Sequence, residues 1–287
     1  MKEILNLFKL RIGVAIALAA AAGLAVGQGS KPGVGQALVL VLAVLAASAA
    51  AGAFNQYVER DLDARMGRTR NRPFVTGKLR RGPAWLWLIG AMMAASVLAA
   101  AAATNIPAAL HVFLGAFTYG VVYTVWLKRR TWWNIVIGGL AGSFAVLAGA
   151  AARVTPDWPL PGPEALWLAV VLFLWTPPHF WSLAIAWRED YAAAGVPMLP
   201  VLIGDARAAR AICAGALLLI VASLVPAAYG LGWLYLACAA AGGAYFLFRC
   251  AALVLDPGRR TARAAFLASL AQLGAVLLGA ILDVAIL

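Results

Sequence analysis

Charged side chains gather in one short stretch of an otherwise apolar chain. Residues 55–73 hold three acids and five arginines directly after an uncharged hydrophobic run. If the helix before them continues to about residue 63, then Asn55, Glu59 and Asp63 recur every four residues and form one oxygen-bearing stripe, from which Asp61 points away. Hard oxygen ligands of this kind suit Mg²⁺, which takes its remaining ligands from water and substrate phosphates.

The arginines that follow the stripe suit the same chemistry. Arg65, Arg68, Arg70 and Arg72 carry guanidinium groups, whose planar geometry matches phosphate oxygens. The alternative is a solvated loop whose basic residues only set the membrane topology. The acids favour the functional interpretation, because Asp and Glu contribute little to topology. We therefore expect a site for a metal ion and a diphosphate.

A second cluster lies within residues 175–200. Pro177 and Pro178 are expected to kink or break a hydrophobic span, and such breaks are tolerated mainly where they are buried in protein or line a cavity. His179 follows them in an apolar segment, which makes it a functional candidate. The alternative is a hydrogen-bonded core histidine.

Arg188, Glu189 and Asp190 end this span on the same face as the first stripe. Two acidic clusters on one face of one bundle would hold two sides of a metal-diphosphate. The alternative for this trio is an interfacial cap.

The composition requires a membrane setting for these residues. The 287 residues are 64% hydrophobic and 12% charged, with a mean hydropathy of +0.89. This lies far outside the range of soluble globular domains. We predict an all-α bundle and a single membrane domain, residues 1–287, with transmembrane helices near 12–29, 34–58, 84–103, 107–127, 133–151, 165–187, 209–229, 231–254 and 264–286.

The basic residues predict the orientation of this bundle. With nine spans, all Lys and Arg residues fall on one face except Lys31 and Arg153. By the positive-inside rule that face and the N-terminus are cytoplasmic, and the C-terminus is outside. We therefore expect a multi-pass protein of the cell's inner membrane, whose site faces the cytoplasm and whose basic face attracts anionic membrane lipids.

Several other classes of function are disfavoured. Nucleic-acid binding would need a soluble basic domain, and the chain has none. Cys213, Cys238 and Cys250 lack CxxC spacing, which argues against disulfides, structural zinc and covalent haem attachment. A secondary transporter would place ionisable groups near the bilayer midplane, whereas nearly all carboxylates here cluster at one face.

Four ordered motifs resemble a known family. The pattern formed by Asn55, Glu59, Asp63, Arg68-Thr69 and Arg72-Pro73 is similar to the NxxxDxxxD…RTxxRP signature of the UbiA-type intramembrane prenyltransferases. Further along, the chain resembles one branch of that family, the protohaem IX farnesyltransferases, which act on haem. Three motifs carry this resemblance: residues 123–131 followed by Asn134–Gly139, then Thr176-Pro-Pro-His-Phe-Trp181, then residues 190–200.

The resemblance implies a reaction. In that branch Mg²⁺ helps to ionise farnesyl diphosphate, and the allylic cation attacks a vinyl group of haem B while water adds, which gives haem O. Farnesyl diphosphate and haem B would then be the substrates. A haem A synthase or another oxidase-assembly protein would be the candidate partner that takes the product.

The resemblance also implies roles for particular residues. Glu59 stands where the broader family has Asp, and the adjacent pair Glu189-Asp190 replaces a spaced pair of aspartates. Metal ligands would be Asn55, Glu59, Asp63, Glu189 and Asp190, of which Asn55, Glu59, Asp63 and Asp190 would also be catalytic. Substrate contacts would be Arg68, Arg72, Lys128, Arg129, Arg130, His179, Arg188 and Glu189, with a cytoplasmic anchor as the alternative for residues 128–130.

Two further alternatives stay open at this point. Another prenyltransferase of the same family would use an aromatic acceptor, such as a hydroxybenzoate or a quinone precursor. A catalytically inactive haem-handling protein would keep the fold alone, although the intact acidic stripe argues against it.

Overall fold

The chain folds into helices that pack side by side. The computed structural model describes residues 6–153 and 161–286, and every regular element in those two ranges is helical. The elements are α2 (Leu10–Val26), α3 (Val34–Val58), α4 (Arg60–Arg65), α5 (Pro73–Thr76), α6 (Pro83–Ala103), α7 (Ile106–Phe117), η1 (Thr118–Leu127), α8 (Asn134–Gly138), α9 (Leu140–Ala151), α10 (Pro163–Ala186), α11 (Arg188–Ala193), α12 (Leu199–Ile203), α13 (Asp205–Leu224), η2 (Val225–Tyr229), α14 (Trp233–Leu255) and α15 (Arg259–Ile286).

The long helices agree closely with the predicted spans. In the described ranges, eight helices are long and apolar enough to cross a membrane, and their ends lie within a few residues of the predicted ones. The first predicted span corresponds to α2, which is apolar but only 17 residues long. The membrane bundle is therefore confirmed, whereas the count of nine spans stays a prediction.

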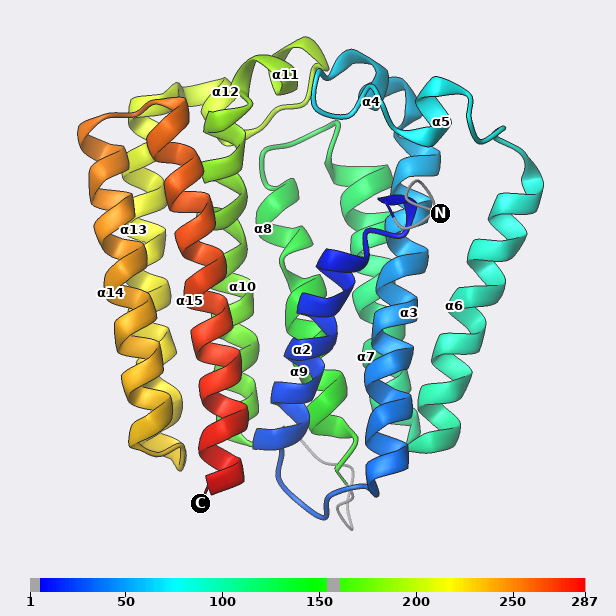
Figure 1. Cartoon of the computed structure of the whole chain (residues 1–287), viewed down its shortest axis with the longest axis vertical. Helices are drawn as coiled ribbons and strands as arrows, with labels where there is room; N and C mark the ends of the chain where they lie inside the picture. The colour runs from blue at the N-terminus through cyan, green and yellow to red at the C-terminus, as the bar shows by residue number, and fades with distance from the viewer. Residues whose placement is uncertain (1–5, 154–160, 287) are drawn as a thin grey trace.

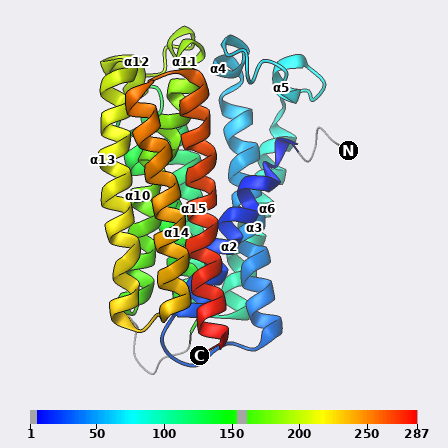
Figure 2. The same ribbon diagram turned by 60° about the vertical axis from the view of Figure 1, so that its left-hand side comes forward.

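The two charged clusters lie at the same end of the bundle. Figures 1 and 2 show α4, α5, α11 and α12 together at one end, which we call the basic end, while the C-terminal end of α15 lies at the other. The short helix α2 begins below the level at which α3 ends (Figure 1). The start of α2 therefore lies beside the last turns of α3, below the loops of the basic end.

Small residues allow the helices to approach closely. A Cβ added to Gly23 of α2 or to Gly149 of α9 would collide with the backbone of the other helix. Earlier in the span that contains Gly149, a Cβ on Gly139 would lie 2.9 Å from the Thr176 Cβ, and one on Gly138 would lie 3.0 Å from the Tyr123 ring. Close backbone contact of this kind stabilises helix pairs in lipid.

Of the predicted kink or break at Pro177 and Pro178, the break is wrong, and the kink stays a prediction. Helix α10 includes both prolines and continues to Ala186. The Pro178 ring faces Gly215 of α13, where an added Cβ would lie 3.7 Å from the ring, an ordinary van der Waals distance. Helices inside a membrane bundle tolerate proline where neighbouring helices and side chains satisfy the backbone groups that it frees.

One of the two basic residues far from the basic end has a structural role. Arg153 is buried, and its Nε and Nη2 donate hydrogen bonds to the carbonyl oxygens of Gly27 and Ala25, at 2.5 and 3.3 Å. These carbonyls belong to the C-terminal end of α2, where a cation also interacts favourably with the helix dipole.

Candidate active site

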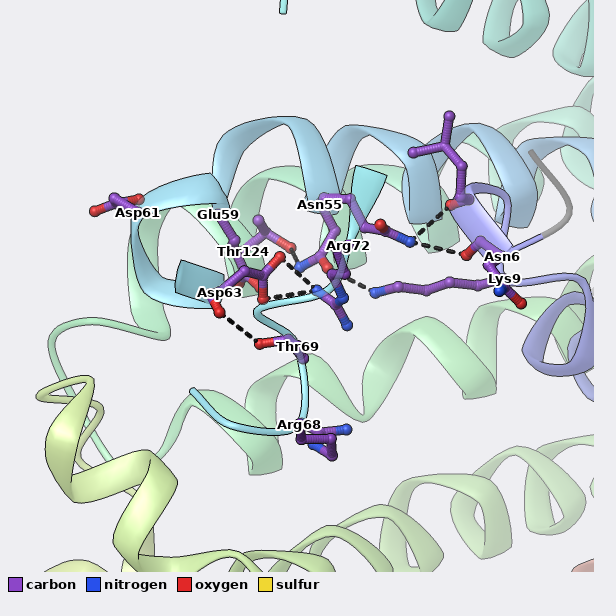
Figure 3. Close-up of polar contacts among 12 residues, drawn as sticks. Asn6, Lys9, Asn55, Glu59, Asp61, Asp63, Arg68, Thr69, Arg72 and Thr124 are labelled. Atoms are coloured by element: carbon purple, nitrogen blue, oxygen red, sulfur yellow. Dashed lines mark hydrogen bonds and ion pairs between the residues drawn. The ribbon is translucent and has the colours of Figure 1, made fainter. Parts of the chain in front are cut away.

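The predicted stripe of oxygen-bearing side chains forms. Helix α3 ends at Val58 and α4 begins at Arg60, but the hydrogen bonding continues between them: the Glu59 N–H donates to the Asn55 carbonyl at 2.9 Å, and the Asp63 N–H donates to the Glu59 carbonyl at 2.8 Å. All three side chains of the stripe are at most 2% exposed. Asn55, Glu59 and Asp63 therefore share one buried face at the basic end (Figure 3).

The element η1 holds two residues of the stripe. The Asn55 amide donates to the Thr124 hydroxyl at 3.0 Å, and the Lys128 ammonium donates to Glu59 Oε2 at 2.6 Å. Both pairs are 69 residues apart, which means that α3 and η1 run parallel. Because η1 is a π-helix, its turns are wider than those of an α-helix, a feature frequent at functional sites.

Arg72 neutralises the third residue of the stripe. The chain turns back after α4, and Arg72 Nη1 donates to both carboxylate oxygens of Asp63, at 2.8 and 2.7 Å (Figure 3). The hydroxyl of Thr69, in the same turn, donates to the Asp63 carbonyl at 3.1 Å. The RTxxRP part of the sequence pattern thus folds onto the end of the stripe.

Lys9 joins the site, although its place in the sequence indicates only a charge that sets the membrane topology. Its ammonium donates to Asn55 Oδ1 at 2.6 Å (Figure 3). It also donates to the Tyr119 hydroxyl at 2.9 Å. Burial, together with the positive charges of Arg72 and Lys128, lowers the pKa of Lys9 to about 7. No sequence spacing signals a contact between residues 46 positions apart.

The second cluster meets the first at the rim of the site. Asp190 accepts a hydrogen bond from the Arg68 backbone N–H at 3.0 Å, and the Arg68 guanidinium donates to the Tyr191 hydroxyl at 3.3 Å. An added Cβ on Gly67 would lie 3.4 Å from the Asp190 carboxylate, an ordinary van der Waals distance, so Gly67 lies close to this carboxylate. Arg68 and Asp190 are therefore together, as predicted, at the mouth of the site.

Other predicted site residues lie on the surface. Arg129 forms a bidentate ion pair with Asp61, at 2.7 and 2.8 Å. The exposed guanidinium holds the pKa of Asp61 below its ordinary value. Arg130 donates to the Trp126 carbonyl, and Arg188 pairs with Asp205 at 3.4 Å. Glu189 is exposed on α11. For these residues the structure gives surface positions outside the stripe.

His179 occupies a packed position within the helices. It is 5% exposed and lies between the rings of Trp175 and Phe266, with ring centroids at 4.0 and 4.4 Å. Its Nδ1 lies 2.7 Å from the Ser269 hydroxyl, which itself donates to the Phe266 carbonyl. Nδ1 is therefore the donor, as in the core-histidine alternative.

One carboxylate oxygen of the site has no partner. Glu59 Oε1 is buried and accepts no hydrogen bond in the described chain, although Oε2 of the same residue is held by Lys128. The described residues contain no group of three or more His, Cys, Asp or Glu side chains placed to hold a metal. An orphaned carboxylate oxygen beside three cations suits an ion that takes most of its ligands from a bound phosphate.

Sequence comparisons place the chain among prenyltransferases. The model of the UbiA prenyltransferase family matches residues 16–273. Protoheme IX farnesyltransferase 2 of Paramagnetospirillum magneticum is 56% identical over 273 residues, which cover 95% of this chain and 93% of that protein. Protoheme IX farnesyltransferase 1 of the same organism is 50% identical over 225 residues, 78% of each protein.

Solved structures share the fold. A digeranylgeranylglyceryl phosphate synthase superposes with a TM-score of 0.75 at 18% identity, covering 100% of this chain and 99% of that one. A UbiA homologue from Archaeoglobus fulgidus, bound to DMAPP and Mg²⁺, has a TM-score of 0.73 at 18% identity, covering 96% and 99%. The chain belongs to the UbiA prenyltransferase family.

Proposed function

We propose that the chain, as one membrane domain, transfers the farnesyl group of farnesyl diphosphate to a vinyl group of haem B, with addition of water, to give haem O. The observation that carries this proposal is the buried Glu59 carboxylate, of which one oxygen has no hydrogen-bond partner among the described residues. It lies in a site with the cations of Lys9, Arg72 and Lys128. The names of the relatives support both the donor and the acceptor.

The residues present fit a bound Mg²⁺ ion. Glu59 would hold it through Oε1, which has no partner in the described chain, together with Asn55 and Asp63, while Asp190 would approach from the second cluster. When bound, the ion would supply positive charge to the departing diphosphate. The orphaned oxygen and the hard donor set support this assignment, as does Mg²⁺ in the A. fulgidus relative.

The chain's own cations stabilise the leaving group. Arg72 and Lys128 lie within hydrogen-bond reach of the stripe, and Arg68 lies at its mouth. As the carbon–oxygen bond of the donor breaks, negative charge grows on the diphosphate. Cations that are already in position stabilise this charge without reorganisation.

An apolar groove beside the site provides room for the farnesyl chain. It has a volume of about 240 Å³ and lies between α3, α6, α7 and η1. Its walls include Ala51, one helical turn before Asn55, and Gly120, next to Tyr119. Its lining also includes Phe54, Leu86, Ile89, Met93, Phe113, Phe117 and Val121. A hydrocarbon chain entering from the lipid would meet only apolar side chains there.

The acceptor is tested by direct assay. Purified protein in lipid is incubated with haem B, farnesyl diphosphate and Mg²⁺, and the haem is analysed by mass. We expect a haem that has gained a farnesyl group and one water. Prenylation of a hydroxybenzoate or quinone precursor instead would overturn the haem assignment and leave the donor chemistry in place.

The membrane orientation and the fate of the product belong to the same proposal. The basic end would face the cytoplasm of a cell with an inner membrane, because basic loops are retained on that side. The product would pass to a haem A synthase or another oxidase-assembly protein. Isolation of the chain from detergent-solubilised membranes without such a protein, even after mild cross-linking, would argue against a direct hand-over.

A further inference from the structure

We propose that Lys9 is a diphosphate-binding residue of the prenyl-transfer site, and that Gln56 is the positioning residue that brings it there. This inference rests on the proposed function, because it assumes that the site binds a prenyl diphosphate. Neither residue belongs to the sequence pattern by which the family was recognised.

The site holds more cations than carboxylates to pair with them. Lys128 is paired with Glu59, and Arg72 is paired with Asp63, so each of these cations already has a carboxylate. Among the described residues, Lys9 has only the neutral Asn55 amide and the Tyr119 hydroxyl as hydrogen-bond partners. Three cations therefore share two carboxylates. A buried ammonium without a counterion is costly, and an incoming diphosphate would provide one.

The backbone at Lys9 points to the same role. Lys9 is the only described non-glycine residue with a positive φ, at φ 48° and ψ 42°, where it precedes α2. Such a left-handed conformation costs free energy in a residue with a Cβ, and it persists where the surroundings enforce it. The stem of the side chain passes over Gly52 of α3, where an added Cβ would lie 3.4 Å from the Lys9 Cβ and Cδ.

Gln56 holds the segment that carries Lys9. Its side-chain amide is 3% exposed and donates to the carbonyl oxygens of Asn6 and Leu7, at 2.9 and 3.1 Å. Leu7 is fully buried against α3. Gln56 follows Asn55 directly in α3. The same helical turn therefore holds the segment that carries Lys9 and presents Asn55 Oδ1, the oxygen to which Lys9 donates.

Ligand binding would change the partner of Lys9. An ammonium and a metal ion cannot both occupy the space in front of Asn55 Oδ1, because their charges repel at contact distance. When a metal-diphosphate enters, the flexible lysine side chain turns from the amide oxygen to a phosphate oxygen. Lys9 thus holds the Asn55 oxygen in the ligand-free protein and binds the diphosphate in the loaded one.

Binding of magnesium diphosphate to the full-length protein in lipid nanodiscs tests this without any acceptor. Lys9→Met removes the charge and keeps the length of the side chain. We expect the dissociation constant of magnesium diphosphate to be roughly ten- to hundredfold higher for this variant than for the wild type, because a hydrogen bond to a charged group usually contributes that much. Lys9→Arg should restore most of the affinity. Lys31→Met, an exposed lysine far from the site, is the matched control and should bind like the wild type.

The positioning role of Gln56 is tested by comparing single and double variants. Gln56→Leu should weaken binding of magnesium diphosphate, and adding Lys9→Met to it should cause little further loss, because both changes remove the same contact. A second measurement uses wild-type protein: magnesium diphosphate should slow acylation of Lys9 by acetic anhydride, read by peptide mass, and leave Lys31 unaffected.

The outcomes separate the two proposals. If Lys9→Met binds magnesium diphosphate as tightly as the wild type, or if the ligand does not protect Lys9 from acylation, the assignment of Lys9 is overturned while the proposed function stands. If the wild type itself does not bind magnesium diphosphate, the proposed function is overturned.

Discussion

Asp61 and Asp63 are chemically identical residues with opposite surroundings. The Asp63 carboxylate is buried in the stripe and held by Arg72, whereas the Asp61 side chain is 52% exposed and pairs with Arg129 on the surface. We expect Asp63→Asn to lower kcat/KM by about a hundredfold or more, because the site loses a charge that orders its cations and metal. The measurement is farnesyl transfer at saturating Mg²⁺.

Asp61→Asn is the matched control for this change. An exposed ion pair contributes little, so this variant should retain activity within about twofold of the wild type. The amide oxygen introduced by Asp63→Asn would still accept a hydrogen bond from Arg72, so both variants should fold in the membrane. Wild-type turnover in Asp63→Asn would contradict the role given to the stripe.

His179 poses a different question, since its sequence context suggests haem and its contacts suggest packing. We expect His179→Leu to lower the midpoint of thermal unfolding in detergent by roughly 2–5 °C, because the hydrogen bond to Ser269 is lost in a buried place. KM for haem should stay within twofold. A large rise in that KM, with a changed haem absorption spectrum, would show instead that the imidazole contacts the acceptor.

Single residues of the site differ in how far the sequence could reveal them. Asn55, Glu59 and Asp63 were predictable because helical periodicity is local. Lys9 was not, because its contact with Asn55 depends on how the segment before α2 packs on α3. The sequence also gives no sign that Arg129 faces Asp61 while its neighbour Lys128 faces the stripe. The substrate contact expected of Arg129 stays a prediction.

At the scale of elements, a side chain of one helix caps the N-terminal end of another, far from the site. Asp283 of α15 is buried and accepts hydrogen bonds from the backbone N–H groups of Gly232 and Tyr235, at 2.5 and 3.1 Å. These groups belong to the first turn of α14, whose N-terminal N–H groups have no partner within the helix. Asp283 therefore acts as a cap supplied by a neighbouring helix.

The effect of removing this cap should be confined to stability. We expect Asp283→Ala to cost about 1–2 kcal/mol, read as a lower unfolding midpoint, while Asp283→Asn should cost less because one acceptor oxygen stays. KM for farnesyl diphosphate should not change in either variant, since the cap lies at the end of the bundle opposite the site (Figure 1). A selective rise in that KM would contradict a purely structural role.

The helical spans were easier to predict than the local irregularities within them. The apolar runs determined the spans because a helix must be long enough to cross the hydrocarbon core, at about 20 residues. Local rules give proline as a helix breaker, yet α10 continues through Pro177 and Pro178. A helix inside a membrane bundle tolerates proline where its surroundings satisfy the freed backbone groups. The π-helix η1 leaves no such local signal, although it sets the register in which Thr124 and Lys128 meet α3.

At the scale of the whole molecule, the distribution of charge links function to orientation. The described site residues lie at the basic end, while the exposed Lys31 and the buried Arg153, which caps α2, lie at the other. A water-soluble diphosphate donor made in the cytoplasm would reach the site directly only if the basic end faces that compartment. Retention of basic loops on the cytoplasmic side would produce the same orientation.

Cysteine labelling in spheroplasts of a Gram-negative host tests this orientation. The three native cysteines are first replaced by alanine, and one cysteine is then introduced at the exposed Thr76, at the basic end, or at the exposed Ser30, at the other. Neither substitution changes a charge that could itself alter topology. We expect a membrane-impermeant maleimide to label Ser30→Cys in intact spheroplasts, and Thr76→Cys only after permeabilisation, because the bilayer shields the cytoplasmic side. The reverse pattern would place the site outside the cytoplasm and would require a donor delivered from the opposite side of the membrane.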